Sequence, residues 1–230
     1  MMRMSFLLLF CFLTRSADAQ KSIGMKIIKK HQQLSDEIAT NATKEMVDLG
    51  FGIPNIRFEL HYAGKENFTG KRMYPPNTKT TFLRVEPAKA LTALAKELEQ
   101  HGLGLLIWDA YRPYSVTVRF WKLIHDERYV ANPLKGSGHN RGIAVDLTLY
   151  KLSNGKELSM PTGFDDFSEK SHHGYPLLNE EQIKNRELLL SLMVKYGFNK
   201  FDTEWWHYFW PDSAQYEILD IPFNKLKMHQ

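Results

Sequence analysis

The stretch SGHNRGIAVDLTLY, residues 137–150, decides the fold because it joins a glycine-rich turn to a strand. Its second half, residues 143–150, alternates and is rich in strand-forming residues, which predicts a β-strand. Its first half flanks His139 with glycines that let the backbone approach closely. The strand carries Asp146 on one face, and the preceding loop can fold His139 back to meet it. We therefore expect this histidine and this aspartate to come together.

Helices and further strands are predicted on both sides of this stretch. A helix is expected over residues 87–101, with a proline in its first turn and Gly102 where a C-terminal cap belongs. Downstream, Asn179 and Gln182 form a capping box for a helix that runs to residue 196. The other expected elements are a weak helical pattern within 24–49, strands over 53–62 and 103–108, an ordered loop over 63–80, a helix over 114–126 and an extended segment over 198–210.

Runs of helix and antiparallel strand favour an α+β fold over a doubly wound sheet. We expect a single domain with a central, mainly antiparallel sheet flanked by helices. The 230 residues suit one domain with an ample core, and a hydrophobic fraction of 43% excludes disorder. The net charge is only +4 and no Lys/Arg block is present, so the sequence carries no nucleic-acid footprint.

The first residues have the pattern of an export signal. A short positive start at Arg3 precedes an apolar run over residues 6–13, and Ala17-Asp18-Ala19 offers the small residues that a signal peptidase prefers. This run is too short to span the ~30 Å of bilayer hydrocarbon, so no membrane span is expected. We predict that residues 1–19 are a signal peptide, and that residues 20–230 form the domain of an exported protein, periplasmic or secreted. A buried N-terminal helix is the alternative.

Candidate metal ligands are limited to histidine and carboxylate side chains. The one cysteine, Cys11, lies in the expected signal peptide, so the mature chain would have no disulfide and no cysteine nucleophile. His139, Asp146 and His207 would supply two imidazoles and a carboxylate, and hydrolytic zinc sites commonly use three protein ligands and leave a position for water. Glu204, three residues before His207, would then serve as general base.

The spacing of these candidate residues alone leaves open that they have only structural roles. The chain has nine histidines, and a histidine in a globular protein usually lies on the surface or in the core. The tryptophans between residues 205 and 210 are by default core residues. The histidine between glycines could mark a turn.

Five motifs in order resemble those of a known enzyme family. The pattern Ser-x-His-x-x-Gly-x-Ala-x-Asp, followed by Glu-x-x-His, is that of the zinc D,D-peptidases. Together with IWDAYRP upstream and EWWHY downstream, SGHNRGIAVDLTLY closely resembles the D-alanyl-D-alanine dipeptidases. The segments HYAGKENFTGK (61–71) and GFDDFSEKSHH (163–173) are also similar. The resemblance covers roughly residues 50–212.

This resemblance implies a zinc D,D-peptidase-like fold. It also implies which side chains bind the metal and which take part in the reaction. His139, Asp146 and His207 resemble the ligands of one zinc ion per chain, and Glu204 resembles the catalytic base. Arg112 resembles the arginine that stabilises the oxyanion, a role that suits a fixed guanidinium in a water-poor site. A surface salt-bridge arginine is the alternative for Arg112, and cobalt or iron would fit the same ligand set.

The resemblance also implies how a substrate is held. Ser137 resembles the residue that helps to hold the substrate carboxylate, while Tyr62 and Asp165 resemble the pair that recognises the free amino group. A carboxylate pairs with an ammonium and rejects an acylated amine, because the buried charge would stay unpaired. Asp166 is the alternative to Asp165. A packed tyrosine and a helix-capping aspartate are the structural alternatives.

The implied activity is zinc-dependent hydrolysis of the dipeptide D-Ala-D-Ala to two D-Ala. Export suits the scavenging of D-Ala-D-Ala released from peptidoglycan. The alternatives are a zinc D,D-carboxypeptidase or peptidoglycan endopeptidase acting on longer peptides, and a non-catalytic, zinc-bearing cell-wall binding module. The expected partner is the small dipeptide; the sequence does not specify an oligomeric state.

Overall fold

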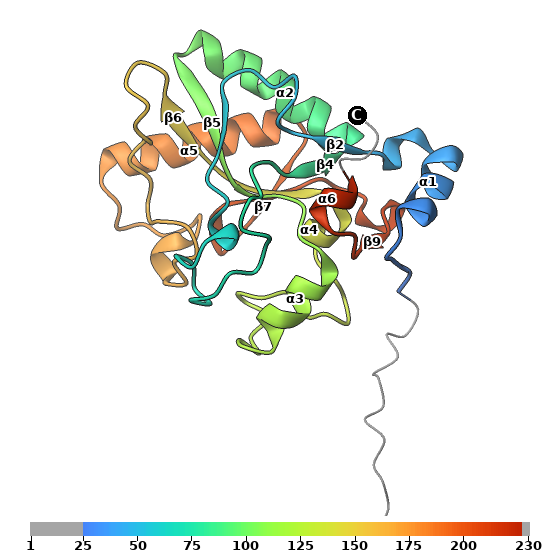
Figure 1. Ribbon diagram of the computed structural model, residues 1–230. Coiled ribbons are helices and arrows are strands. Elements are labelled where there is room, and N and C mark those ends of the chain that lie inside the picture. Colours follow the sequence, from blue (N-terminus) through green and yellow to red (C-terminus); the bar gives the residue numbers. More distant parts are fainter. Residues whose placement is uncertain (1–24, 227–230) are drawn as a thin grey trace, which may run out of the picture.

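A five-stranded mixed sheet forms the centre of the protein, whose computed structural model describes residues 25–226 (Figure 1). The expected signal peptide, residues 1–19, lies outside the described residues. Only the pair β3–β5 is parallel, and the other neighbours are antiparallel, which confirms the predicted α+β fold with a mainly antiparallel sheet. The strand order is β3 (Ile56–Phe58), β5 (Leu103–Asp109), β6 (Ala144–Lys151), β8 (Glu204–Phe209) and β7 (Asn199–Phe201).

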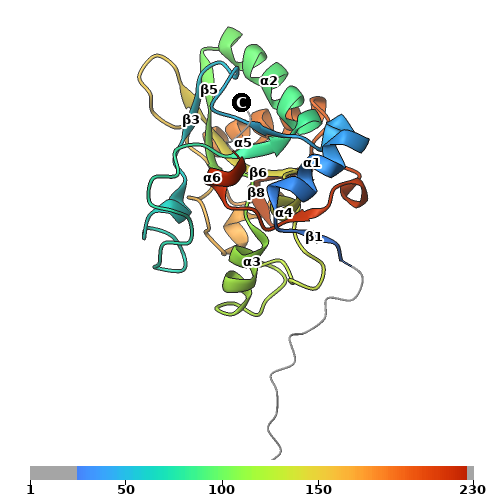
Figure 2. The same ribbon diagram turned by 45° about the vertical axis from the view of Figure 1, so that its right-hand side comes forward.

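Two long helices, α2 (Val85–Gln100) and α5 (Glu180–Lys195), cover one face of this sheet. Their leucines join the inward residues of β5 and β6 in one buried cluster. Two views of the ribbon place α2 on the side of the molecule away from α3 (Tyr114–Trp121) (Figures 1 and 2). The helices thus bury one sheet face in the core and leave the other face to the loops.

Strand register decides which side chains reach that second face. In β6, Leu147 and Leu149 belong to the helix-side cluster and pair with β5. Because successive side chains in a strand point to opposite faces, Asp146 points away from the two helices. His207 of β8 lies directly opposite Asp146 in the register. The strand prediction for residues 143–150 is therefore confirmed, and Asp146 lies beside a second candidate ligand.

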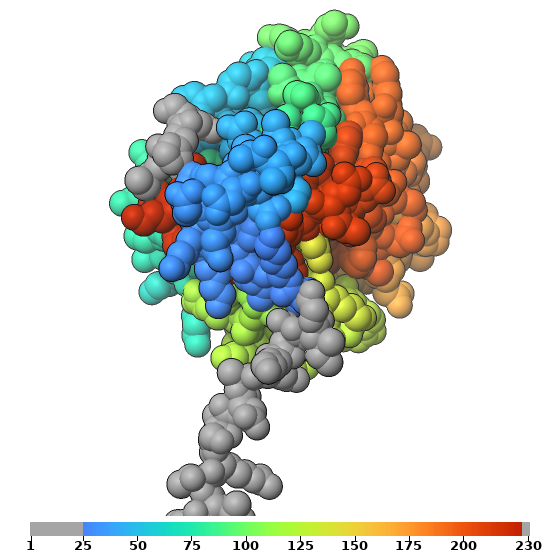
Figure 3. Space-filling model, turned by 90° about the vertical axis from the view of Figure 1, so that its right-hand side faces the viewer, coloured from blue at the N-terminus to red at the C-terminus, as the bar shows by residue number. Residues whose placement is uncertain are grey.

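The two ends of the described chain lie together on one side of the molecule. Strand β1 (Ile27–Ile28) pairs in parallel with β9 (Ile218–Leu219). Figure 3 shows the N-terminal residues in blue beside the C-terminal residues in red. The remaining elements are α1 (His31–Thr40), η1 (Ala42–Lys44), β2 (Met46–Asp48), η2 (His61–Ala63), β4 (Phe82–Arg84), α4 (Gly138–Arg141), η3 (Glu169–Ser171), η4 (Ser213–Gln215) and α6 (Phe223–Leu226).

Most of the long predicted elements are present, and two of them are shorter than expected. Helix α3 ends at Trp121, and the chain turns further on at Asp126, whose carboxylate accepts from the backbone N–H of Arg128 at 3.0 Å. Strand β3 begins only after Asn55, which has a left-handed φ of 50°. Across residues 25–226, no helix has the length and apolar character needed to cross a bilayer.

Candidate active site

His139 lies on the one-turn helix α4, where the sequence predicted a loop. The Ser137 hydroxyl oxygen accepts from the backbone N–H of Asn140 at 3.2 Å, and the Asn140 side chain accepts from the Ser137 N–H at 3.1 Å. Gly142 ends the turn with a φ of 71°, which a glycine adopts without steric cost. This reciprocal cap gives the histidine a rigid position beside β6.

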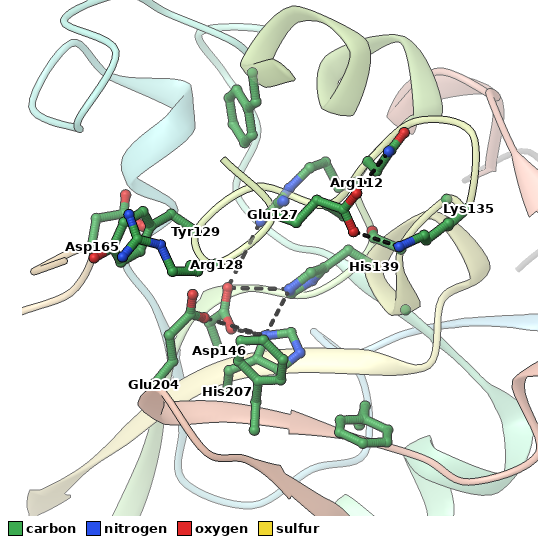
Figure 4. Close-up of a pocket in the computed structure, with 18 of the residues that line it drawn as sticks. Arg112, Glu127, Arg128, Tyr129, Lys135, His139, Asp146, Asp165, Glu204 and His207 are labelled. Carbon is green, nitrogen blue, oxygen red and sulfur yellow. Dashed lines mark hydrogen bonds and ion pairs between the residues drawn. The ribbon is translucent and has the colours of Figure 1, made fainter. Parts of the chain in front are cut away.

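His139, Asp146 and His207 converge on one point (Figure 4), with their candidate ligand atoms within 4.8 Å of one another. His139 Nε2 lies 3.3 Å from Asp146 Oδ2 and 3.2 Å from His207 Nδ1, and His207 Nδ1 lies 2.8 Å from Asp146 Oδ1. Ligands of a tetrahedral zinc lie about 3.3 Å apart when each bond is about 2.0–2.1 Å. The donor set and its spacing therefore fit a zinc ion.

A backbone contact fixes the tautomer of His139. Its Nδ1 lies 2.6 Å from the carbonyl oxygen of Ala110, so this nitrogen carries the proton and donates. The Nε2 lone pair is then left to face Asp146 and His207. Histidine ligands are commonly oriented in this way by a partner for the other ring nitrogen.

The two histidines beside Asp146 favour the ionised form of its carboxyl group. Burial opposes ionisation, but His139 and His207 outweigh it and lower the pKa of Asp146 below its usual value. The residue is 2% exposed. An ionised, buried carboxylate beside two imidazole nitrogens is an oxygen ligand for a divalent cation.

Glu204 enters the same cavity from the first position of β8. Residues three apart in a regular strand point to opposite faces, but the β7–β8 pairing is irregular next to Phe201, and both Glu204 and His207 line the cavity. Glu204 Oε2 lies 3.9 Å from His207 Nδ1. Burial, followed by the charge of Asp146, raises the pKa of Glu204 from 4.5 to about 8. A cation held by the three candidate ligands would lower it again.

The raised pKa of Glu204 makes the stability of the metal-free protein depend on pH. Folded Glu204 binds its proton more tightly than the unfolded chain does, so this contribution to stability is full below pH 4.5 and is lost as the pH rises through about 8. We expect the Tm of the chelated wild type to fall relative to that of Glu204→Gln between about pH 5 and pH 8.5. A constant difference in Tm between the two proteins across this range would contradict the assignment.

Arg112 is held at the edge of the candidate metal site by a second carboxylate. Its Nε and Nη2 donate to Asp109 Oδ2 at 3.0 and 2.8 Å, while Nη2 lies 3.9 Å from Asp146 Oδ2. Tyr74 donates to the other oxygen of Asp109 at 2.8 Å. Burial opposes the charge of Arg112, but Asp109 outweighs it and raises the pKa of the guanidinium above its usual value. Arg112 is only 8% exposed and nevertheless stays charged.

Tyr62 and Asp165 meet at another wall of the cavity, from segments far apart in the sequence. The Tyr62 hydroxyl lies 3.0 Å from each carboxylate oxygen of Asp165. Asp165 has a left-handed φ of 57°, whereas Asp166 accepts from the backbone N–H of Ser168 at 2.9 Å. Of the two neighbouring aspartates, Asp165 is the one that lines the cavity. Burial raises the pKa of Asp165 well above its usual value.

One cavity of about 370 Å³ brings together all eight residues that the sequence singled out. They are Tyr62, Arg112, Ser137, His139, Asp146, Asp165, Glu204 and His207. Sequence reasoning missed the rest of the wall, which includes Phe68, Phe120 and residues 127–129, 131, 132, 135 and 136. Phe120 lies on α3 and the others come from loops, so no single pattern in the sequence marks them. Of the tryptophans interpreted as core residues, Trp205 is fully buried, but Trp206 also lines the cavity.

Three candidate ligands with an acid beside them make the arrangement of a metal-dependent hydrolase. The profile of the Peptidase M15 family, described as D-Ala-D-Ala dipeptidase, matches residues 42–227, and the chain belongs to this family of metallopeptidases.

The chain is similar to several proteins named D-alanyl-D-alanine dipeptidase. The Escherichia coli protein is 38% identical over 185 residues, which cover 79% of this chain and 93% of that protein. The Enterococcus faecalis protein is 35% identical over 192 residues, 73% of this chain and 88% of that one. Among solved structures, an LD-carboxypeptidase, LdcB, is a distant match at 22% identity and a TM-score of 0.40, covering 74% of this chain and 70% of that one.

Proposed function

We propose that this protein hydrolyses D-Ala-D-Ala to two molecules of D-Ala with one zinc ion. The observation that carries the proposal is one cavity that holds both a candidate metal site and a paired tyrosine and aspartate suited to a free amino group. The family match and the similar dipeptidases support the same substrate. A substrate with an amine at one end and a carboxylate at the other suits the polar groups around this cavity.

His139, Asp146 and His207 would hold the zinc ion. When bound, zinc acts as a Lewis acid that polarises the substrate carbonyl and lowers the pKa of water to about 7. The buried Asp146 carboxylate and the Ala110 contact of His139 orient these ligands before any metal arrives. Such support from neighbouring groups sets both ligand direction and basicity.

Glu204 would act as the general base and then as the general acid. Its carboxylate takes a proton from the attacking water and delivers that proton to the nitrogen of the leaving D-Ala. Burial raises the pKa of this carboxyl group and a bound cation would lower it again, so the group would both accept and release a proton near neutral pH.

Arg112 would stabilise the negative charge that develops on the carbonyl oxygen. Its guanidinium is held in place by Asp109, so little reorganisation is needed during the reaction. A fixed fork of donors in a site with little water gives more stabilisation than the same group in bulk water.

The amino end and the carboxylate end of the dipeptide would bind at different walls of the cavity. Asp165 and Tyr62 would bind the ammonium group, which compensates the half-buried carboxylate. Ser137 would donate its hydroxyl proton to the substrate carboxylate, because its oxygen already accepts from Asn140. An acylated amine would leave Asp165 without a counter-charge, which disfavours N-blocked peptides.

Export remains a prediction from the sequence. Residues 1–19 would direct the protein out of the cytoplasm, where D-Ala-D-Ala released from peptidoglycan is available for scavenging. Cell fractionation tests this directly, and recovery of the native enzyme with the cytoplasm would contradict it.

Removal of the metal should abolish the activity reversibly. We expect dialysis against a chelator to eliminate hydrolysis of D-Ala-D-Ala, because the three ligands alone do not polarise the substrate. Stoichiometric zinc should restore it, at one ion per chain by metal analysis. Activity that survives removal of all bound metal would refute the zinc-dependent mechanism.

A further inference from the structure

The catalytic cavity has a second cavity behind one of its walls. The second cavity has a volume of about 350 Å³ and is lined by residues from the segments around 59–68 and 157–165. Among the lining residues, only Phe68 and Asp165 border both cavities. These two side chains therefore form the partition between them.

Phe68 is held in this partition by its own loop. The amide nitrogen of the preceding Asn67 donates to the carbonyl oxygens of His61, Gly64 and Lys71 at 3.2, 3.2 and 3.1 Å. Its amide oxygen accepts from the backbone N–H of Thr69 at 3.0 Å. The Asn67 side chain therefore links the backbone before Phe68 to the backbone after it, and these bonds fix the position of Phe68.

The ring of Phe68 is also packed against three other aromatic rings. Its centroid lies 6.1 Å from Tyr62, 5.0 Å from Phe120 and 5.4 Å from Phe167, each in an edge-on arrangement. Such contacts are favourable beyond the area that they bury. The partition is therefore a fixed wall made of packed rings.

The second cavity is acidic. Its lining contains Glu59, Glu66 and Glu157 together with the partition residue Asp165, and contains no lysine or arginine. Burial, followed by the charge of Glu59, raises the pKa of Glu157. A cavity lined by one sign of charge attracts the opposite charge, so this one favours an ammonium group.

The proposed binding mode fixes the direction in which a longer substrate would run. If Asp165 and Tyr62 bind the ammonium group of a dipeptide, a further residue at the amino end would extend past Asp165 toward Phe68. Both of these residues also line the second cavity. A tripeptide would place its own ammonium group among the glutamates there, provided that the wall were open.

We propose that Phe68 is the specificity-determining residue that limits the substrate to two residues, by separating the catalytic cavity from the acidic cavity behind it. The inference rests on the proposed function. Asp165 disfavours substrates without a free ammonium group because its charge would stay unpaired. Phe68 excludes a third substrate residue because its ring fills the space that this residue would need. With the ring removed, water would add across the last peptide bond of D-Ala-D-Ala-D-Ala, and the products would be D-Ala and D-Ala-D-Ala.

The test compares Phe68→Ala with Phe167→Ala, which removes a ring that packs on Phe68 but borders neither cavity. Initial rates with D-Ala-D-Ala and D-Ala-D-Ala-D-Ala are followed by chromatography of the products. We expect the tripeptide-to-dipeptide ratio of kcat/KM to rise at least about tenfold in Phe68→Ala, and to stay near the wild-type ratio in Phe167→Ala.

The outcomes separate this inference from the proposed function. An active wild type whose ratio does not change in Phe68→Ala contradicts the partition alone, and so does an equal rise in Phe167→Ala. A wild type that does not hydrolyse the dipeptide contradicts the proposed function instead. If Phe68→Ala does not fold by circular dichroism, Phe68→Leu replaces it, and the ratio should then rise by a smaller factor.

Discussion

Glu204→Gln should lower the turnover of D-Ala-D-Ala by about 10²–10⁴ while the protein keeps its zinc. Glutamine has the shape of glutamate but cannot accept the proton of the attacking water or deliver it to the leaving amine. Glu204 is not one of the three residues that converge on the candidate metal site. Its loss should therefore affect proton transfer and leave metal binding intact.

The comparison variant for Glu204→Gln is His207→Ala, which removes a candidate ligand and should lose both zinc and activity. Zinc content is measured by atomic absorption after dialysis, and turnover by release of D-Ala. Undiminished turnover in Glu204→Gln would refute the role of general base. Loss of zinc in that variant would assign Glu204 to the ligand set.

Asp165→Asn should lower kcat/KM for free D-Ala-D-Ala by about 30-fold or more, since removing one partner of a desolvated charge pair costs about 2–5 kcal/mol. Asparagine keeps the size of the side chain and tolerates the left-handed φ of 57° at this position. The substitution therefore removes the charge without disturbing the turn. The effect should appear mainly in KM, because the ammonium group lies away from the reacting bond.

The neighbouring residue provides a matched control for Asp165. Asp166 does not line the cavity and instead accepts a backbone hydrogen bond within its loop. Asp166→Asn should leave KM within about twofold of the wild-type value, because this side chain does not line the cavity. Equal losses in the two variants would show that the loop, and not the carboxylate of Asp165, is responsible.

The helices were predictable because their signals are local. Asn179 and Gln182 satisfy the first turn of α5 as a capping box, with the Asn179 side chain accepting from the Gln182 N–H at 2.9 Å. Gly102 adopts a φ of 68° directly after α2, as a C-terminal glycine should. Such contacts depend on residues a few positions apart, so the sequence alone indicates them.

The metal candidates were predictable in part. The alternation of β6 places Asp146 on one face of the strand, as expected, and the structure shows that this face points away from the helices. Glu204 and His207, three apart in a strand, would point to opposite faces of a regular sheet. Their residue types and the resemblance to the peptidase family therefore put them in one site, and strand geometry did not. The irregular pairing next to Phe201 that brings both to the cavity has no signature in the sequence.

The remaining walls of the cavity depend on contacts between distant loops. Asp109 and Tyr74, which fix Arg112, are 35 residues apart. The aromatic rings that pack on Phe68 belong to residues that no common helical or strand spacing links to it in the sequence. Local periodicity reports which face of an element is buried, and it does not report which loops meet over that face.

Hydrolysis of free D-Ala-D-Ala compared with N-acetyl-D-Ala-D-Ala tests the central claim most directly. Purified protein is assayed with each compound, before and after chelation, and again after zinc is added. The account predicts cleavage of the free dipeptide only, lost on chelation and restored by zinc. Cleavage of the acetylated compound would assign the protein to the carboxypeptidases and contradict the amine-binding role of Asp165, and no cleavage of either compound by the zinc-bound protein would contradict the catalytic account altogether.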